Sequence, residues 1–173
     1  YVPLILVVIN SFNKNKSFNW PPTGFTTMWW SKAASNPGVK DAIFLSFLTA
    51  TFATIIALIL GSLAAAAIAR YKFFGRDVIS LIFVLPIALP GIVTGIALNN
   101  VFTNFFGGLT FFTIIIGHAT FCVVVVFNNV AARYRRMGSS FEEASMDLGA
   151  NRITTFRLVT FPMIRNALVA GGL

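Results

Sequence analysis

The stretch at residues 42–69, AIFLSFLTATFATIIALILGSLAAAAIA, decides the fold class of this chain, because it holds no charged residue. A helix that crosses the hydrocarbon core of a bilayer needs about 20 apolar residues. Residues 78–102 and 109–130 also meet this length, which gives three whole spans. Shorter apolar runs at 1–12 and 162–173 predict the end of an earlier span and the start of a later one. The sequence therefore predicts an all-α, polytopic transmembrane helical bundle.

The composition of residues 1–173 points the same way, and we expect them to form a single membrane domain. Hydrophobic residues make up 57% of the chain and charged residues 10%, whereas soluble domains carry about 25% charged residues. Tyr1 is not an initiator residue and apolar runs reach both ends, so we expect a fragment of a longer polypeptide. The lone Cys122 and the lone His118 cannot supply four zinc ligands, so the sequence predicts no metal site and no intrachain disulfide.

Basic residues between the spans predict which side of the membrane each connection faces. Those in the connections after the first and third whole spans are Arg70, Lys72, Arg76, Arg133, Arg135, Arg136, Arg152, Arg157 and Arg165. The smaller group on the opposite side is Lys14, Lys16, Lys32 and Lys40. The positive-inside tendency places the larger group in the cytoplasm. The net charge of +8 is therefore interpreted as membrane topology, and no nucleic-acid partner is predicted.

The second span is interrupted by Pro86 and Pro90, which are followed by Gly91 and Gly95. Each proline removes a backbone donor and displaces a carbonyl, so we expect the helix to kink or open here. Broken helices often line transport paths. A kinked helix that packs closely through its glycines explains the same pattern. The sequence leaves both interpretations open.

Three polar residues inside the spans are further candidates for a path: Asn99, His118 and Thr120. Asn99 approaches the external end of the second span, whereas His118 and Thr120 lie in the middle of the third. Polar groups inside a bilayer tend to face a cavity or a partner helix. A neutral histidine also serves as a hydrogen-bonding group between helices. No acidic residue falls inside any span, which argues against a proton-driven carrier.

The most informative stretch is on the cytoplasmic side, at residues 139–150, SSFEEASMDLGA. Ser140 and Glu143 match a capping box that starts a helix, and Gly149 suits the left-handed residue that ends one. A helix of about eight residues does not persist alone in water, so another element must hold it. One small apolar face is formed by positions i, i+3, i+4 and i+7: Phe141, Ala144, Ser145 and Leu148. Glu143 and Asp147 form an acidic edge beside it.

A second short helix is expected at about residues 152–159, and Pro162 suits the first turn of the next membrane helix. Residues 139–160 thus predict a helix-turn-helix on the cytoplasmic side. Such an element fits docking on a partner protein. It equally fits an amphipathic segment that lies flat on lipid headgroups, as the neighbouring arginines indicate. The residue pattern alone favours neither.

The segment at residues 139–160 is similar to a known motif. Glu143-Ala144-Ser145, Asp147-Leu148-Gly149-Ala150, Phe156, Val159 and Pro162 resemble the EAA motif of binding-protein-dependent ABC importer permeases. In that family the motif forms coupling helices, which fit into a cleft of the cytoplasmic ATPase subunit. The resemblance implies that the coupling positions are Glu143, Ala144, Asp147, Leu148 and Gly149. Ser145 departs from the motif's second alanine, and Phe161 with Arg165-Asn166 departs from the usual prolines.

Other stretches resemble the second permease subunit of spermidine/putrescine importers. They are Asn10-Ser11-Phe12-Asn13, Gly24-Phe25-Thr26-Thr27 with Trp29, Arg70-Tyr71-Lys72-Phe73 with Gly75, and His118-Ala119-Thr120-Phe121-Cys122. This resemblance implies that the solute is a polyamine. Pro90-Gly91 departs from the Pro-Asp pair of several polyamine permeases and removes a carboxylate near the path. Alternative solutes are phosphonate, ferric ion and thiosulfate.

The resemblance also implies a location and partners. The location is the prokaryotic plasma (inner) membrane, and the partners are a cytoplasmic ABC ATPase dimer, a second, homologous permease subunit and an external solute-binding protein. The chain has no Walker motif, GxxxxGK[ST], so ATP and Mg belong to the ATPase partner and no cofactor is expected here. We expect no enzymatic activity and no catalytic residue on this chain. The remaining alternative is a channel or carrier that works without ATP.

Overall fold

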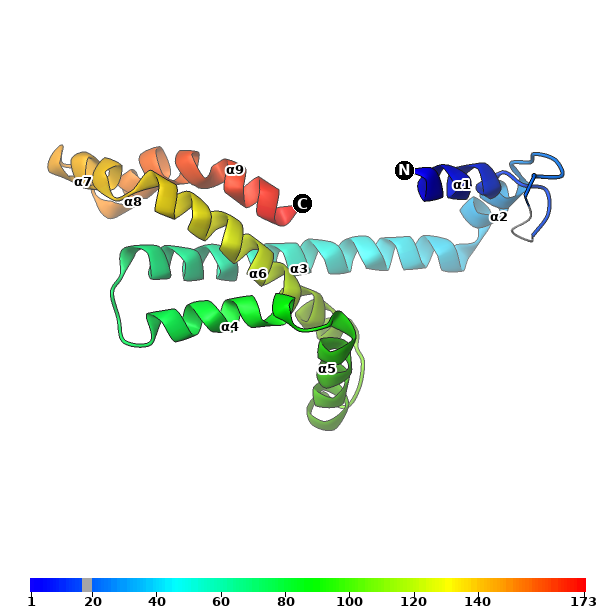
Figure 1. Ribbon diagram of the computed structural model, residues 1–173, viewed down its shortest axis with the longest axis horizontal. Helices are drawn as coiled ribbons and strands as arrows, with labels where there is room; N and C mark the ends of the chain where they lie inside the picture. Colours follow the sequence, from blue (N-terminus) through cyan, green and yellow to red (C-terminus); the bar gives the residue numbers. More distant parts are fainter. Residues whose placement is uncertain (17–19) are drawn as a thin grey trace. The chain divides into compact units, whose positions relative to one another are not determined.

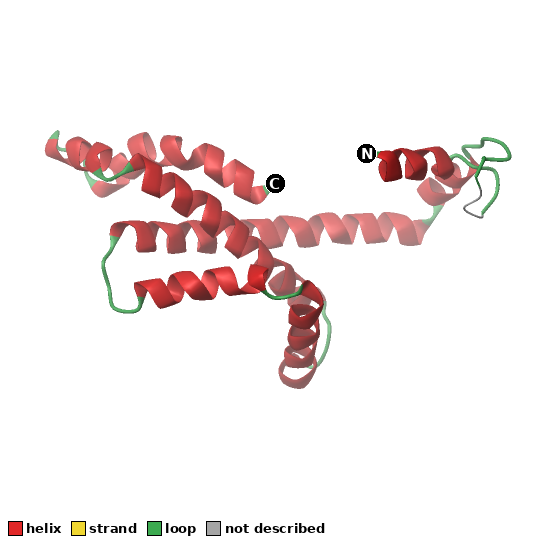
Figure 2. Cartoon of the chain, in the orientation of Figure 1, coloured by secondary structure: helices red, strands yellow, loops and turns green. Residues whose placement is uncertain are grey.

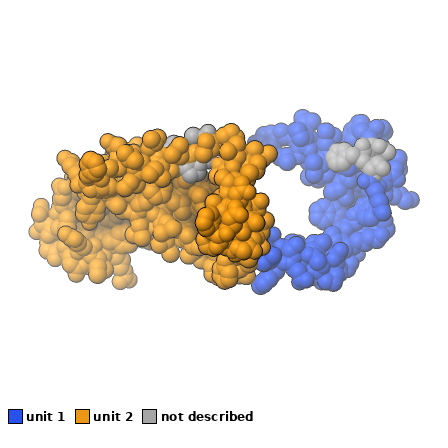
Figure 3. All heavy atoms as spheres, turned by 90° about the horizontal axis from the view of Figure 1, so that it is seen from below, with its two compact units in different colours: residues 1–47 blue, residues 48–173 orange. Residues whose placement is uncertain are grey.

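The computed structural model describes residues 1–16 and 20–173, without the side chains of Val84, Pro86, Ile87 and Ala88. It divides into two compact units, residues 1–47 and 48–173 (Figure 3). Helices form nearly all of the described part, which holds no strand longer than an isolated bridge (Figure 2). The predicted all-α class is therefore confirmed.

The first unit contains α1 (Val2–Ser11), α2 (Met28–Ser35) and the first part of α3 (Pro37–Arg70). An antiparallel bridge between Asn13 and Phe25 closes the connection from α1 to α2. Asn13 is fully buried, and its carbonyl accepts a hydrogen bond from the indole nitrogen of Trp29 at 3.1 Å. This loop is therefore held by backbone and indole hydrogen bonds rather than by a hydrophobic core.

Among the residues that the structure describes, two helices are long and apolar enough to cross a membrane, α3 (Pro37–Arg70) with 34 residues and α6 (Phe111–Met137) with 27. Large apolar side chains on α3 face outward, among them Phe44, Phe47 and Leu63. Such a surface requires lipid or protein around it, because soluble monomers rarely expose large apolar patches. These two helices match the predicted spans at 42–69 and 109–130.

The predicted span at 78–102 is two helices rather than one. α4 (Arg76–Ala88) and α5 (Gly91–Phe106) are separated at Leu89, whose backbone is extended, and Pro90. A residue before proline avoids the helical conformation, and proline cannot donate to the preceding turn. The expected opening of the helix is therefore a full break. Among the described helices, α4 and α5 are each shorter than a membrane span.

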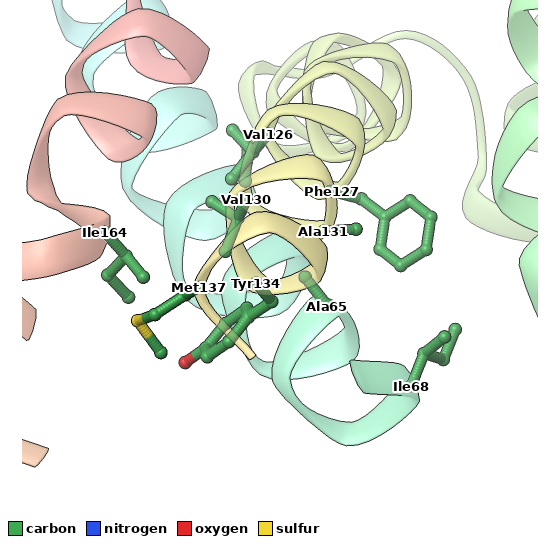
Figure 4. Packing of buried hydrophobic residues seen from close by; sticks show 10 residues of the cluster. Ala65, Ile68, Val126, Phe127, Val130, Ala131, Tyr134, Met137 and Ile164 are labelled. Atoms are coloured by element: carbon green, nitrogen blue, oxygen red, sulfur yellow. The ribbon is translucent and has the colours of Figure 1, made fainter. Parts of the chain in front are cut away.

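Helix α6 forms the centre of the second unit. It packs between the later part of α3 and α9 (Phe161–Gly172), and Figure 4 shows side chains from all three helices in one cluster. A Cβ added at Gly61 of α3 or at Gly171 of α9 would lie 2.9 Å from the backbone of α6, at Val123 and Val126 respectively. Phe83 of α4 stacks on Phe127 with ring centroids 4.6 Å apart. Small residues thus allow close helix contacts, as is typical of membrane bundles.

The chain after α6 turns through α7 (Ser140–Asp147), α8 (Arg152–Thr155) and the π-helix η1 (Phe156–Thr160), and then enters α9. In Figure 1, α7 and α8 lie at the same end of the second unit as the connection between α3 and α4, whereas the connection from α5 to α6 lies away from it. The basic connections that the sequence places on one side therefore lie at one end of this unit.

Candidate functional site

The candidate site is α7 together with the turn that follows it. α7 begins at Ser140, two residues after Gly138, which ends α6 with φ +68°. The predicted capping box is wrong, because Ser140 already lies inside the helix. The N-cap is Ser139, and its backbone is helical instead of extended, so its side chain makes no capping hydrogen bond.

The end of α7 agrees with the sequence. Gly149 adopts φ +88°. Its amide donates a hydrogen bond to the carbonyl of Met146 at 2.9 Å, and the amide of Ala150 donates one to the carbonyl of Ser145 at 3.1 Å. These two bonds form a Schellman motif, in which the left-handed residue is usually glycine. Gly149 therefore fixes the direction in which the chain leaves α7.

Polar residues attach α7 to the rest of the second unit. Glu142 accepts a hydrogen bond from Thr160 of η1 at 2.7 Å and pairs with Arg70 of α3 at 2.8 Å. Ser145 and Thr155 of α8 share a hydrogen bond of 3.2 Å between their hydroxyls. No described residue of α7 is buried, so these polar contacts, and not a hydrophobic core, orient the helix.

Three large apolar side chains at α7 and its C-terminal end are exposed. Phe141 is 56% exposed, Met146 43% and Leu148 90%. The predicted apolar face is therefore only partly correct, because Ser145 turns inward to Thr155 while Phe141, Ala144 and Leu148 face outward. Ser145 faces Thr155 because its hydroxyl forms a hydrogen bond with that residue, whereas the side chains of Phe141, Ala144 and Leu148 have no polar group. The predicted coupling positions, all of them exposed, are Glu143, Ala144, Asp147, Leu148 and Gly149.

The second helix of this segment is continuous with the next one. Asn151 caps α8 by accepting a hydrogen bond from the amide of Thr154 at 2.8 Å. The predicted helix at 152–159 runs through η1 into α9 without a gap, and Pro162 lies in the first turn of α9. Proline has no amide to donate to the carbonyl four residues back, and the wide π turn directly precedes it.

The predicted path residues are not gathered at one place in this chain. Thr120 lines an apolar cavity of about 390 Å³ between α3, α4 and α6, and its hydroxyl donates to the carbonyl of Ile116 at 2.8 Å. Pro90, Asn99 and His118 are exposed and do not line that cavity. The side chain of Pro86 lies outside the described residues.

The residues of the site that sequence reasoning did not single out are Arg70, Tyr134, Glu142, Thr155 and Thr160. The guanidinium of Arg70 lies over the ring of Tyr134, 5.0 Å from its centroid, while pairing with Glu142. In the sequence, Arg70 stood out only as a basic residue, and its charge was used to predict which side of the membrane that connection faces. No spacing rule links residues this far apart in the chain, so only the folded structure brings them together.

Comparisons with known proteins identify the class. Residues 57–173 match the family described as binding-protein-dependent transport system inner membrane component. The chain belongs to this family, whose members are inner membrane components of ABC importers. The matched residues include α7 together with Arg70, Tyr134, Glu142 and Thr160, and they leave out residues 1–56. The predicted family is thereby confirmed.

Particular relatives are polyamine permeases. The chain is 34% identical to the spermidine/putrescine transport system permease protein PotC of Escherichia coli K12, over 99% of this chain and 64% of that protein. It is 32% identical to the putrescine transport system permease protein PotI of the same strain, over 100% and 64%. The sulfate transport system permease protein CysT of Salmonella typhimurium is 32% identical over 83% and 56%. The chain thus spans less than two thirds of these relatives.

A solved structure supports the fold. The crystal structure of a bacterial ABC transporter involved in the import of the acidic polysaccharide alginate superposes with a TM-score of 0.62, covering 98% of this chain and 61% of that one. The two sequences are 19% identical, so the likeness is one of fold. It agrees with the helical architecture described above.

Proposed function

We propose that this chain is the permease subunit of an ATP-driven importer for a polyamine and that α7 is its coupling helix. It crosses the inner membrane several times, and an external binding protein delivers spermidine or putrescine. A cytoplasmic ATPase dimer hydrolyses ATP with Mg, and a second, homologous permease subunit completes the path. The chain itself is not an enzyme; it converts movement at α7 into movement of the membrane helices.

The exposed face of α7 is the observation that carries this proposal. Leu148 is 90% exposed at the end of the helix, and the polar contacts of Glu142 and Ser145 keep that face outward. Apolar side chains held in this way favour burial against a partner protein. The exposed carboxylates of Glu143 and Asp147 favour a protein over a membrane surface, because anionic headgroups repel them.

Identity to polyamine permeases supports the solute. Two permeases for spermidine or putrescine match nearly the whole of this chain. The candidate path residues are neutral: Pro86, Pro90, Asn99, His118 and Thr120. A polyamine would therefore pass along amide, hydroxyl and imidazole groups, with no carboxylate from residues 42–69, 78–102 or 109–130. Sulfate is the second candidate solute, because the sulfate permease is also 32% identical.

Co-purification tests the coupling role. In mild detergent we expect the tagged chain to bring an ABC ATPase with it. Leu148→Ser should remove the ATPase, because it takes an exposed apolar side chain out of the docking face. The matched control is Leu158→Ser in η1, which is 68% exposed but lies outside α7 and should retain the ATPase. A wild-type chain that purifies without any ATPase contradicts the proposal and favours a channel or carrier, or an α7 that lies on lipid.

Uptake in proteoliposomes tests the solute. The complete complex with its binding protein should accumulate radiolabelled putrescine in the presence of ATP, and unlabelled spermidine should compete. Sulfate should neither compete nor accumulate. ATP-dependent accumulation of sulfate without putrescine would assign the chain to the second candidate solute and leave the coupling role unaffected.

A further inference from the structure

A polar cluster joins α7 to the cytoplasmic end of α3. Its members are Arg70, Tyr134, Glu142 and Thr160, which come from α3, α6, α7 and η1. Glu142 uses both carboxylate oxygens: Oε2 lies 2.8 Å from Nε of Arg70, and Oε1 accepts the hydroxyl of Thr160 at 2.7 Å. One side chain of α7 thus reaches two other helices.

The cluster is sheltered from water. The side chains of Arg70 and Glu142 are 19% and 15% exposed. The ring of Tyr134, itself 4% exposed, lies under the guanidinium of Arg70. Figure 4 shows Tyr134 in the same packed group as Ala65 and Ile68 of α3. Ion pairs that are screened from solvent interact more strongly than surface pairs, and removing one partner leaves the other charge uncompensated.

The neighbouring links of α7 pass through glycines. Gly138 joins α6 to α7 with φ +68°, and Gly149 follows α7 with φ +88°. A hypothetical Cβ meets nothing within 4 Å at either glycine, so neither turn is packed against another helix at that position. The chain connections of α7 are therefore turns, whereas the cluster around Glu142 is a largely sheltered contact with a helix that is distant in sequence.

From this geometry we infer that Arg70 and Glu142 form a latch that makes the cytoplasmic end of α3 move together with α7. Arg70 is a positioning residue: it does not touch the ATPase or the solute, and it acts through Glu142. Coupling travels through such contiguous contacts when they bias a shared movement. The inference rests on the proposed coupling role and adds the route by which movement at α7 reaches a membrane-crossing helix.

Spin labels test this latch without knowledge of the solute. In a Cys122→Ala background, Tyr71→Cys and Ser140→Cys place labels on exposed positions beside Arg70 and at the start of α7. In the assembled complex we expect one narrow distance distribution that is the same without nucleotide and after trapping with ATP and vanadate. Arg70→Met should broaden or shift it, and Arg70→Lys should restore much of it. The inference is overturned if trapping changes the distance distribution while Arg70 and Glu142 are both intact. It is also overturned if Arg70→Met leaves that distribution unchanged.

A double-mutant cycle tests the latch by its effect on ATPase activity. Arg70→Met and Glu142→Gln should each lower the stimulation of ATPase activity by the loaded binding protein about fivefold or more, while the ATPase still co-purifies. The double variant should be no worse than either single variant, because both remove the same interaction. The matched control Glu143→Gln, on the exposed face, should leave the label distances unchanged. Additive losses contradict the latch. Loss of ATPase binding in the Arg70 variant also contradicts it, whereas absence of an ATPase from the wild-type complex contradicts the proposed function instead.

Discussion

Two regions of the second unit are held together in opposite ways. Around α6, small residues bring helices into close contact, and most of the buried side chains are apolar. Around α7 no described residue of the helix is buried, and hydroxyls with one ion pair set its orientation. The helices around α6 are therefore held by close packing of their side chains. The candidate coupling helix α7 is held by a few polar contacts, which leave its apolar side chains exposed.

The largest expected effect is in the α6 region. Gly61→Val should destabilise the chain by about 3 kcal/mol, because the added Cβ would lie 2.9 Å from the carbonyl oxygen of Val123. The measurement is the midpoint of thermal unfolding in detergent. Gly95→Val, where a Cβ meets nothing within 4 Å, is the matched control and should change the midpoint far less. Equal midpoints for the two variants would show that close packing does not hold this region.

The next effect concerns the exposed face of α7. Phe141→Ala should weaken binding of the ATPase by about 2 kcal/mol and leave thermal unfolding unchanged, because the ring is 56% exposed in the chain and would be buried in the proposed complex. Phe156→Ala is the comparison variant, since that ring is 51% exposed but lies in η1. Binding measured by titration of the ATPase into the permease distinguishes them. Similar losses for both rings would remove the special role of α7.

A smaller effect is expected at the inner face of α7. Ser145→Ala should cost about 1 kcal/mol of stability, because it removes the hydrogen bond to the buried hydroxyl of Thr155. Thermal unfolding again provides the measurement. Adding Thr155→Val should recover part of the loss, since no hydroxyl is then left without a partner. A double variant that loses the sum of the two single effects would indicate that the residues do not interact.

The smallest effects separate two helix starts. Asn151→Ala should cost about 1 kcal/mol, because Asn151 caps α8 through the amide of Thr154. Ser139→Ala should cost almost nothing, because that N-cap serine makes no capping hydrogen bond. Both variants can be compared by thermal unfolding of the same preparation. A larger loss at Ser139 than at Asn151 would show that the side chain of Ser139 does cap α7.

Several features of the fold could be predicted from the sequence because they depend on local chemistry. Long uncharged stretches predicted α3 and α6, and the prolines predicted the interruption between α4 and α5. Gly149 predicted the end of α7, since its left-handed backbone suits glycine. The predicted start of α7 was wrong by one residue, because the sequence has two adjacent serines that could each be the N-cap. After the turn at Gly138 the N-cap is Ser139 and not Ser140.

The sequence by itself determined the class of the protein, the apolar surroundings that its helices need and the short helix that we propose for coupling, because hydropathy, charge and glycine conformation act over a few residues. Only the tertiary structure decided which face of α7 is exposed and that Arg70 meets Glu142. The physical reason is that an eight-residue helix has no orientation of its own. Its orientation comes from bonds to helices that are remote in sequence, and those bonds exist only after the chain has folded.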